Sequence, residues 1–227
     1  MDAVLTATWI YSPPQGDLPV VHHDRDLFVV DKPSGLLSVP GRDPAHHDSA
    51  LERAEKQSGQ RLFAVHRLDM DTSGLLVFAT RRKAERELFR QFRERLVTKR
   101  YLAWVAGNVA ENEGVIDHPL SREQGRPRSH VDANGRAART RYVRLKRRDG
   151  ASCLALHPET GRSHQLRVHC LALGHPILGD RFYAPSEVVA ASPRLLLHAE
   201  RLSLLHPWSG EPLALSSPCP FSLTEVP

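Results

Sequence analysis

The chain has little of what marks several common protein classes. Its 227 residues include only three cysteines, and none of them forms a Cys-x-x-Cys pair: Cys153, Cys170 and Cys219. An odd, scattered set of thiols is typical of a reducing compartment and argues against a disulfide framework. No apolar run approaches the length of a membrane span, and no charged-then-apolar signal sequence opens the chain. These absences favour a cytoplasmic globular protein without a membrane association.

Metal-ligand and nucleotide-binding patterns are also missing. Thirteen histidines raise the question of a metal site, but they are spread along the chain. Neither His22-His23 nor His46-His47 is accompanied by a second ligand pair at zinc spacing. No glycine-rich phosphate-binding loop is found either. We therefore expect no metal and no cofactor.

Positive charge is concentrated in two stretches of a moderately basic chain, whose formal net charge is +5. Residues 81–100 hold nine lysines and arginines against three glutamates, and residues 122–148 hold ten against two acidic residues. The first sixty residues have the opposite balance, with five basic and nine acidic residues. Such asymmetry is typical of a surface that binds a polyanion, and the excess of arginine favours planar contacts to phosphates or bases. A nucleic-acid partner is expected.

Hydrophobic patterning predicts more strands than helices. The chain is 41% hydrophobic, which at this length is enough for one full core. Short apolar runs predict strands at 27–30, 75–79, 101–105, 140–145, 152–156, 195–197 and 202–205. Helical spacing predicts helices near 51–55, over 84–96, and over 166–173 before Gly174. Strands and helices do not alternate strictly, so the expected fold class is α+β: one domain with a central mixed, mainly antiparallel β-sheet flanked by helices and loops.

Two stretches of the chain lack a periodic pattern that would predict a helix or a strand. Residues 1–19 contain several prolines and glycines without periodicity, and are interpreted as an N-terminal tail ahead of a domain at 20–227. Residues 121–138 are rich in arginine, glycine and proline, and their composition predicts no particular conformation.

The most informative segment is the one that precedes the apolar run Leu75–Ala79. Six polar residues fall within eight positions there: His66, Arg67, Asp69, Asp71, Thr72 and Ser73. Polar groups beside a buried strand are costly unless each finds a partner. Functional sites are where proteins accept such costs. An Asx or Ser/Thr turn leading into a core strand is the structural alternative.

This segment also resembles a known family. The order His66-Arg67-Leu68-Asp69-x-Asp71-Thr72-Ser73-Gly74 is similar to the signature of the RluA-type pseudouridine synthases, in which the aspartate at the position of Asp69 is catalytic. Further segments match the same family in the expected order: Lys32–Gly35, Lys99–Ala103, Gly161–His169, Gly174–Asp180 and Leu195–Ala199. The resemblance covers residues from about 20 to about 215. It implies the pseudouridine synthase fold, without the S4 RNA-binding module that longer members carry before it.

The implied activity is that of an isomerase acting on RNA without a cofactor. Making pseudouridine breaks the bond between ribose C1′ and uracil N1, turns the base and rejoins it through C5, whose proton then leaves. One carboxylate can serve as nucleophile, as base at C2′ or as electrostatic stabiliser, and the sequence leaves these roles open. Resemblance to the short members implies 23S rRNA, the tRNA anticodon stem-loop, or both as substrates.

The resemblance also implies roles for other residues. Arg167 would pair with Asp69 and keep it ionised, and Tyr101 would stack on the uracil. The target uridine must leave its stack, and Arg67 is the candidate to fill the vacated space. Leu196 and Leu197 would form a pocket wall. RNA contacts are expected from the remaining candidates: Arg81, Arg82, Arg90, Arg93, Lys99, Arg100, Arg162 and His164.

Two other functions are compatible with parts of the sequence. A glycosidase-like hydrolase could use Asp69 and Asp71, but such enzymes need two carboxyls that flank the substrate, and the basic surroundings suit RNA better. A noncatalytic RNA-binding or ribosome assembly protein could retain the same fold. The adjacent pair Ser163-His164 lacks the context of a nucleophile elbow. A monomer is the default expectation for the oligomeric state.

Overall fold

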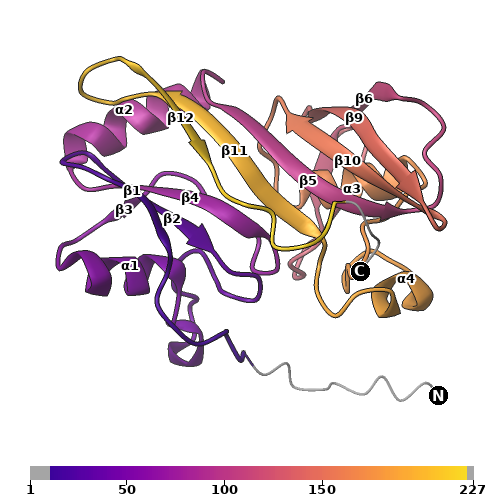
Figure 1. The fold of residues 1–227 in the computed structure, drawn as a ribbon, viewed down its shortest axis with the longest axis horizontal. Helices are drawn as coiled ribbons and strands as arrows, with labels where there is room; N and C mark the ends of the chain where they lie inside the picture. Colours follow the sequence, from indigo (N-terminus) through magenta and orange to yellow (C-terminus); the bar gives the residue numbers. More distant parts are fainter. Residues whose placement is uncertain (1–10, 224–227) are drawn as a thin grey trace.

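The computed structural model describes residues 11–223, and a ten-stranded sheet forms its centre (Figure 1). The strand order is β1-β2-β4-β11-β5-β10-β9-β6, with β3 beside β4 and β12 beside β11. The strands are β1 Val20–His23, β2 Leu27–Lys32, β3 Phe63–Ala64, β4 Ser73–Ala79, β5 Thr98–Ala106, β6 Glu113–Asp117, β9 Arg139–Arg148, β10 Ala151–Pro158, β11 Leu197–Leu205 and β12 Pro212–Ser216. Every pair is antiparallel except β4 with β11. The predicted α+β class with a mixed, mainly antiparallel sheet is confirmed.

Helices cover both faces of the N-terminal half of the sheet. The helices are α1 Ala50–Ser58, α2 Arg82–Arg93, α3 Gln165–Ala172 and α4 Ser186–Ala190, with a 3-10 turn at Pro44–His46. Along β2, Leu27 and Val29 pack in one cluster with α2, whereas Phe28 and Val30 pack in another with α1. A strand that is buried on both faces reads as a continuous apolar run, which explains the pattern at 27–30 and 75–79.

The helix predicted over 84–96 is shorter than expected. Ala84 and Leu88 are buried as predicted, but α2 ends at Arg93 and Leu96 is 45% exposed. Arg95 takes a left-handed backbone conformation, with φ of 60°, and turns the chain away from the helix axis. Leu96 therefore leaves the buried stripe, although its spacing from Phe92 fits the helical period.

The region from 121 to 138 contains a small second sheet. β7 Leu120–Arg122 pairs with β8 Ser129–Val131, and Leu120 packs with Val168 of α3. α3 itself covers the face of β5 and β10, and Gly174 follows its end with φ of 84°, as predicted. The polar segment thus forms a hairpin packed beside α3.

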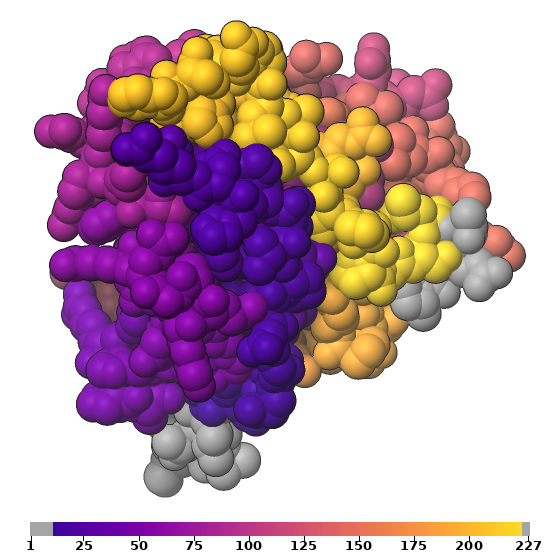
Figure 2. Space-filling model, turned by 60° about the vertical axis from the view of Figure 1, so that its left-hand side comes forward, coloured from indigo at the N-terminus to yellow at the C-terminus, as the bar shows by residue number. Residues whose placement is uncertain are grey.

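The C-terminal strands return to the middle of the molecule. The strand predicted at 202–205 is the second part of a longer strand, β11, and β12 was not predicted. β11 begins at Leu197, so Leu195 and Leu196 of the strand predicted at 195–197 precede it. β11 lies between β4 and β5 (Figure 1), and the C-terminal segment occupies the surface between the N-terminal and middle parts of the chain (Figure 2). This return joins both halves of the sheet beside the polar segment that precedes β4.

The segment before β1 is packed against the fold. Leu18 is buried, and the hydroxyl of Tyr11 donates to the carbonyl of Asp48 and accepts from the amide of Leu37. Residues 1–10 of the expected tail lie outside the described residues, so the predicted domain limits stay a prediction. Within residues 11–223, no helix is both long enough and apolar enough to span a membrane.

Candidate active site

A cavity of about 1360 Å³ brings together segments that are far apart in the sequence. Its lining includes the polar segment before β4, the C-terminal end of α2, the start of β5 and the loop that leads into α3. Asp69, Tyr101 and Arg167 all line this cavity. The three residues predicted to be catalytic therefore share one site.

The loop that carries Asp69 is held from behind by the Lys32–Gly35 segment. The Lys32 ammonium donates to three carbonyls, those of Pro33, Leu36 and Met70, at 2.7–2.8 Å. The hydroxyl of Ser34 donates to the carbonyl of Asp71 at 2.6 Å. Burial lowers the pKa of Lys32 to about 7, and the nearby carboxylates of Asp71 and Asp69 oppose this shift. The role of this segment is to fix the backbone at Met70 and Asp71.

Gly74 lets the Asp69 loop enter the sheet beside β11. Its φ is 113°, and a Cβ at this position would lie 2.3 Å from the carbonyl oxygen of Ala199. Only glycine combines this backbone conformation with so close an approach. The glycine that ends the signature segment is thus required by the parallel pairing of β4 with β11.

The Asp69 carboxylate lies between two nitrogen donors. Its Oδ2 is 3.5 Å from Nη1 of Arg167, and its Oδ1 is 3.9 Å from Nε2 of His164. The Asp69 side chain is 26% exposed, whereas that of Arg167 is 2% exposed. The catalytic candidate therefore faces the cavity, and the buried Arg167 contacts it as the resemblance implied.

Arg167 is anchored by a second carboxylate. Its Nε and Nη2 donate to the two oxygens of Asp180 at 2.9 and 2.6 Å, in a bidentate ion pair that is almost fully buried. Burial opposes the charge of Arg167, but the hydrogen bonds and charge of Asp180, with Asp69, raise the pKa of the guanidinium overall. Two nitrogens of the fork are thus held by Asp180, and the third is directed at Asp69.

Tyr101 supplies an aromatic ring and a hydroxyl to the same cavity. It packs against two core clusters through β5, opposite Ala199 and Leu156 in the sheet. Burial, and then the charge of Asp69, raise the pKa of Tyr101. The hydroxyl is therefore protonated at neutral pH. Leu197 also lines the cavity, as predicted for a pocket wall.

His66 supports the site from within the fold. Its Nε2 accepts a hydrogen bond from the amide of Val77 at 2.9 Å, and its ring stacks on Phe92 with centroids 4.9 Å apart. Burial, and then the charge of Lys99, lower the pKa of His66 to about 3. A neutral ring that accepts a backbone hydrogen bond is a structural element of the loop.

The cavity is strongly cationic. Three carboxylates line it (Asp69, Asp71 and Glu159), against nine basic side chains: Arg67, Arg93, Arg95, Lys99, Arg122, Arg136, Arg162, Arg167 and Arg181. The predicted contacts Arg67, Arg93, Lys99, Arg162 and His164 are thus at the cavity, and Arg67 is exposed there. This balance of charge suits a ligand with several phosphates.

Five predicted site residues lie outside the cavity lining. Arg81 pairs with Asp26 and Arg82 with Glu85 at the opposite end of α2. Arg90 pairs with Glu87 and Glu94. Arg100 alternates with Lys99 and Tyr101 along β5, so it faces the other side of the sheet and pairs with Glu200 at 3.2 Å. Leu196 alternates with Leu197 in the same way, and packs with Trp104 and Cys153 instead of forming a pocket wall.

Several site residues were not singled out from the sequence. Arg95, Arg122, Arg136 and Arg181 add to the cationic lining, and Asp180, Phe182 and Tyr183 surround Arg167. The adjacent order Asp180-Arg181-Phe182-Tyr183, two aromatic residues after a charged pair, is the signal that could have drawn attention to this segment.

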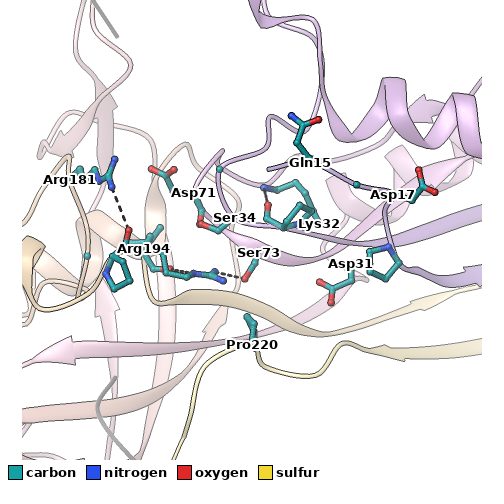
Figure 3. Close-up of a pocket in the computed structure, with 17 residues that line it drawn as sticks. Gln15, Asp17, Asp31, Lys32, Ser34, Asp71, Ser73, Arg181, Arg194 and Pro220 are labelled. Atoms are coloured by element: carbon teal, nitrogen blue, oxygen red, sulfur yellow. Dashed lines mark hydrogen bonds between the residues drawn. The ribbon is translucent and has the colours of Figure 1, made fainter. Parts of the chain in front are cut away.

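A second cavity of about 590 Å³ is lined by Asp71 and Ser73, which follow Asp69 in the chain (Figure 3). Asp71 and Arg181 line both cavities. In the second cavity, Arg194 donates to Oγ of Ser73 at 2.7 Å, and this oxygen also lies 2.9 Å from Nδ1 of His198. The network joins the first residue of β4 to β11 and adds to the support of the loop.

One group of side chains within residues 11–223 has a spacing that could hold a metal ion. It consists of Asp24, Asp26 and His206. Asp26 already pairs with Arg81, and Asp24 lies within 2.6 Å of His22 and 3.1 Å of His206. None of these residues lines either cavity. The expectation of a metal-free and cofactor-free site stays a prediction.

Comparisons with known proteins identify the family. The model of the RNA pseudouridylate synthase family matches residues 26–172. The chain belongs to this family of RNA-modifying isomerases. The dual-specificity RNA pseudouridine synthases RluA of Pasteurella multocida and Escherichia coli K12 are each 49% identical over 215 residues, which cover 93% of this synthase and 98% of theirs.

Solved structures agree in fold. Human RNA pseudouridylate synthase domain containing 1 superposes with a TM-score of 0.78 at 31% identity, covering 94% of this synthase and 89% of the human chain. Human RNA pseudouridylate synthase domain containing 4 superposes with a TM-score of 0.70 at 27% identity, covering 89% and 88%. The predicted pseudouridine synthase fold and isomerase activity are thereby confirmed at the level of the family.

Proposed function

We propose that this synthase converts uridine to pseudouridine in 23S rRNA, in the anticodon stem-loop of tRNA, or in both, with Asp69 as its essential carboxylate. The observation that carries the proposal is the position of Asp69 in a cavity lined by nine cations, with the buried Arg167 3.5 Å away. The dual specificity named for the bacterial relatives supports two classes of RNA substrate.

The cavity suits a uridine that has left its stack. The charged lining would hold the phosphates on either side of the flipped nucleotide, and the exposed Arg67 would fill the space that the base vacates. Tyr101 would stack on the uracil, with Leu197 as a wall. Asp69 would act on the ribose as nucleophile, as base at C2′ or as electrostatic stabiliser. We propose that the synthase works as a cytoplasmic monomer, without metal or cofactor.

Release of tritium from C5 of uridine tests the reaction directly. Purified synthase is incubated with RNA labelled at C5, using tRNA and a 23S rRNA fragment side by side, and the label released to water is counted. Release from one RNA or both would identify the substrate class. Tight binding of both RNAs without release would support the noncatalytic RNA-binding alternative.

Asp69→Asn tests the assigned carboxylate, with Asp71→Asn as its matched control. The two side chains are two positions apart and line the same cavity, but the contact with Arg167 is made by Asp69. We expect Asp69→Asn to abolish release while RNA affinity stays within about threefold, and Asp71→Asn to retain most activity. Equal losses in both variants would favour a pair of carboxylates, and a parallel loss of binding would contradict the catalytic role of Asp69.

A further inference from the structure

The two donors that face Asp69 are both held by one short segment. Asp180 grips Arg167, and three residues later the hydroxyl of Tyr183 lies 2.6 Å from Nδ1 of His164. The turn between them is closed by the amides of Phe182 and Tyr183, which donate to Oδ1 of Asp180 at 3.0 and 3.3 Å. Tyr183 thus contacts His164 from the side away from Asp69 by a hydrogen bond, just as Asp180 anchors Arg167 by hydrogen bonds.

The amide of Ser129 indicates which atom donates in the hydrogen bond between Tyr183 and His164. The amide of Ser129, a buried residue of β8, donates to the hydroxyl oxygen of Tyr183 at 2.9 Å, because a backbone N–H can only donate. Burial raises the pKa of Tyr183, so its hydroxyl keeps its proton at neutral pH and can give it to Nδ1 of His164. A proton on Nδ1 instead would leave the lone pair of Nε2 facing the carboxylate of Asp69.

We propose that Tyr183 is a positioning residue that holds His164 with its proton on Nε2, so that His164 donates to Asp69 from the side opposite Arg167. The proposal rests on the proposed function in one respect, namely that Asp69 is the catalytic carboxylate. The present separation of 3.9 Å between Nε2 and Oδ1 would shorten in the complex with RNA, as active-site hydrogen bonds commonly do.

The backbone at His164 supports a dedicated role for its ring. His164 takes a left-handed conformation, with φ of 54° and ψ of 20°, directly before α3. Residues other than glycine are uncommon in this region, and those that adopt it cluster at active sites. The ring is further enclosed by edge contacts with Phe182 and Tyr183, at centroid distances of 5.7 and 5.6 Å.

The arrangement connects the β7–β8 hairpin to the catalytic loop. Ser129 lies in β8, Tyr183 follows α3, His164 precedes α3 and Asp69 precedes β4. The sequence predicted no particular conformation for this hairpin, and the structure links it by two hydrogen bonds to His164, the residue that faces the Asp69 carboxylate.

The tautomer of His164 can be read without any measurement of activity. In ¹⁵N NMR spectra of histidine-labelled synthase, the signal that disappears in His164→Gln identifies this ring. We expect an unprotonated Nδ1 and a protonated Nε2 in the wild type at neutral pH. A protonated Nδ1 would overturn the proposal whether or not the RNA substrate is known.

The kinetic test uses Tyr183→Phe, which keeps the ring contacts and removes the hydroxyl. We expect its single-turnover rate on bound RNA to fall about tenfold at pH 8, the effect of one lost hydrogen bond, with RNA affinity unchanged within about twofold.

Burial lowers the pKa of His164, and Asp69, Arg167, Asp180 and Arg122 are the charged groups that modify it. At pH values below this lowered pKa the ring gains its second proton and carries hydrogen on both nitrogens, so the deficit of Tyr183→Phe should shrink there.

Two controls separate positioning from general damage. Tyr142→Phe removes the hydroxyl of another tyrosine in the sheet, and its pH–rate profile should match that of the wild type. In a His164→Gln background, Tyr183→Phe should have no further effect, because its action passes through His164. A rate and profile of Tyr183→Phe equal to those of the wild type, or additive losses in the double variant, would refute the proposal. Absence of release from every RNA by the wild type would instead refute the proposed function.

Discussion

Asp180→Asn isolates the charge that anchors Arg167. Asparagine has nearly the same shape as aspartate, and its one oxygen can still accept the amides of Phe182 and Tyr183, so the turn is kept. The guanidinium of Arg167 then loses the charged partner of its two short hydrogen bonds, at a site where the Arg167 and Asp180 side chains are 2% and 1% exposed. Removing one partner of a buried ion pair costs about 3–5 kcal/mol. We expect the free energy of unfolding to fall by that amount.

The control is Asp48→Asn, which breaks an equally well-formed pair near the surface. Arg53 donates from Nε and Nη2 to both oxygens of Asp48 at 2.7 and 2.6 Å, but Asp48 is 41% exposed. Pairs of this kind contribute about 0–1 kcal/mol. Urea denaturation of both variants at pH 7, with m-values equal to that of the wild type, gives the comparison.

Turnover should also fall in Asp180→Asn. Without the carboxylate of Asp180, the guanidinium of Arg167 can rotate and turn other N–H groups toward Asp69. The position of the Asp69 carboxylate in the cavity is then no longer fixed. We expect a fall in the tritium-release rate of at least about tenfold, with RNA affinity within about threefold. A stability loss below about 1 kcal/mol, as for Asp48→Asn, would refute the reasoning. An equal loss of affinity would make Arg167 a phosphate contact.

Two further predictions concern RNA binding and acid stability. Arg93→Ala and Arg162→Ala, at the cavity, should each lower the slope of log Kd against log salt by about one, whereas Arg82→Ala, paired with Glu85 outside it, should leave the slope unchanged. An unchanged slope in the first two would place the RNA surface elsewhere. His66 has its pKa lowered from 6.5 to about 3 in the fold, so between these values the unfolded chain binds more protons and stability falls as the pH falls. His66→Gln should remove up to about 1.4 kcal/mol per pH unit of this acid loss, and an identical slope in urea melts from pH 6 to pH 4 would contradict a ring that stays neutral in the fold.

Some features of the site are local and were predictable. Asp69 and Gly74 stand in one short signature, and the Lys32–Gly35 turn follows the first long apolar strand. Arg167 falls on the helix predicted over 166–173. These residues could be assigned because the motif and the periodicity of a single segment identify them.

Other features depend on which face of an element is turned to the cavity. Arg82 and Arg90 belong to the same basic stretch as Arg93, but α2 points them at glutamates of its own surface. Leu196 and Leu197 are neighbours in an apolar run, and the alternation of the backbone sends one to each side of the sheet. The residue type shows that such a side chain is basic or apolar, but it does not show which face of the helix or sheet the side chain is on.

The sequence by itself determined the family, the fold class, the catalytic candidates and the basic character of the ligand site, because each of these rests on residue types and their order within segments of the chain. Only the tertiary structure decided how the Asp69 carboxylate is surrounded. Asp180 and Tyr183 reach it through Arg167 and His164, and Ser129 reaches Tyr183 from a hairpin more than fifty positions away. Hydrogen bonds between segments so distant depend on the register of the whole sheet, and no local pattern records that register.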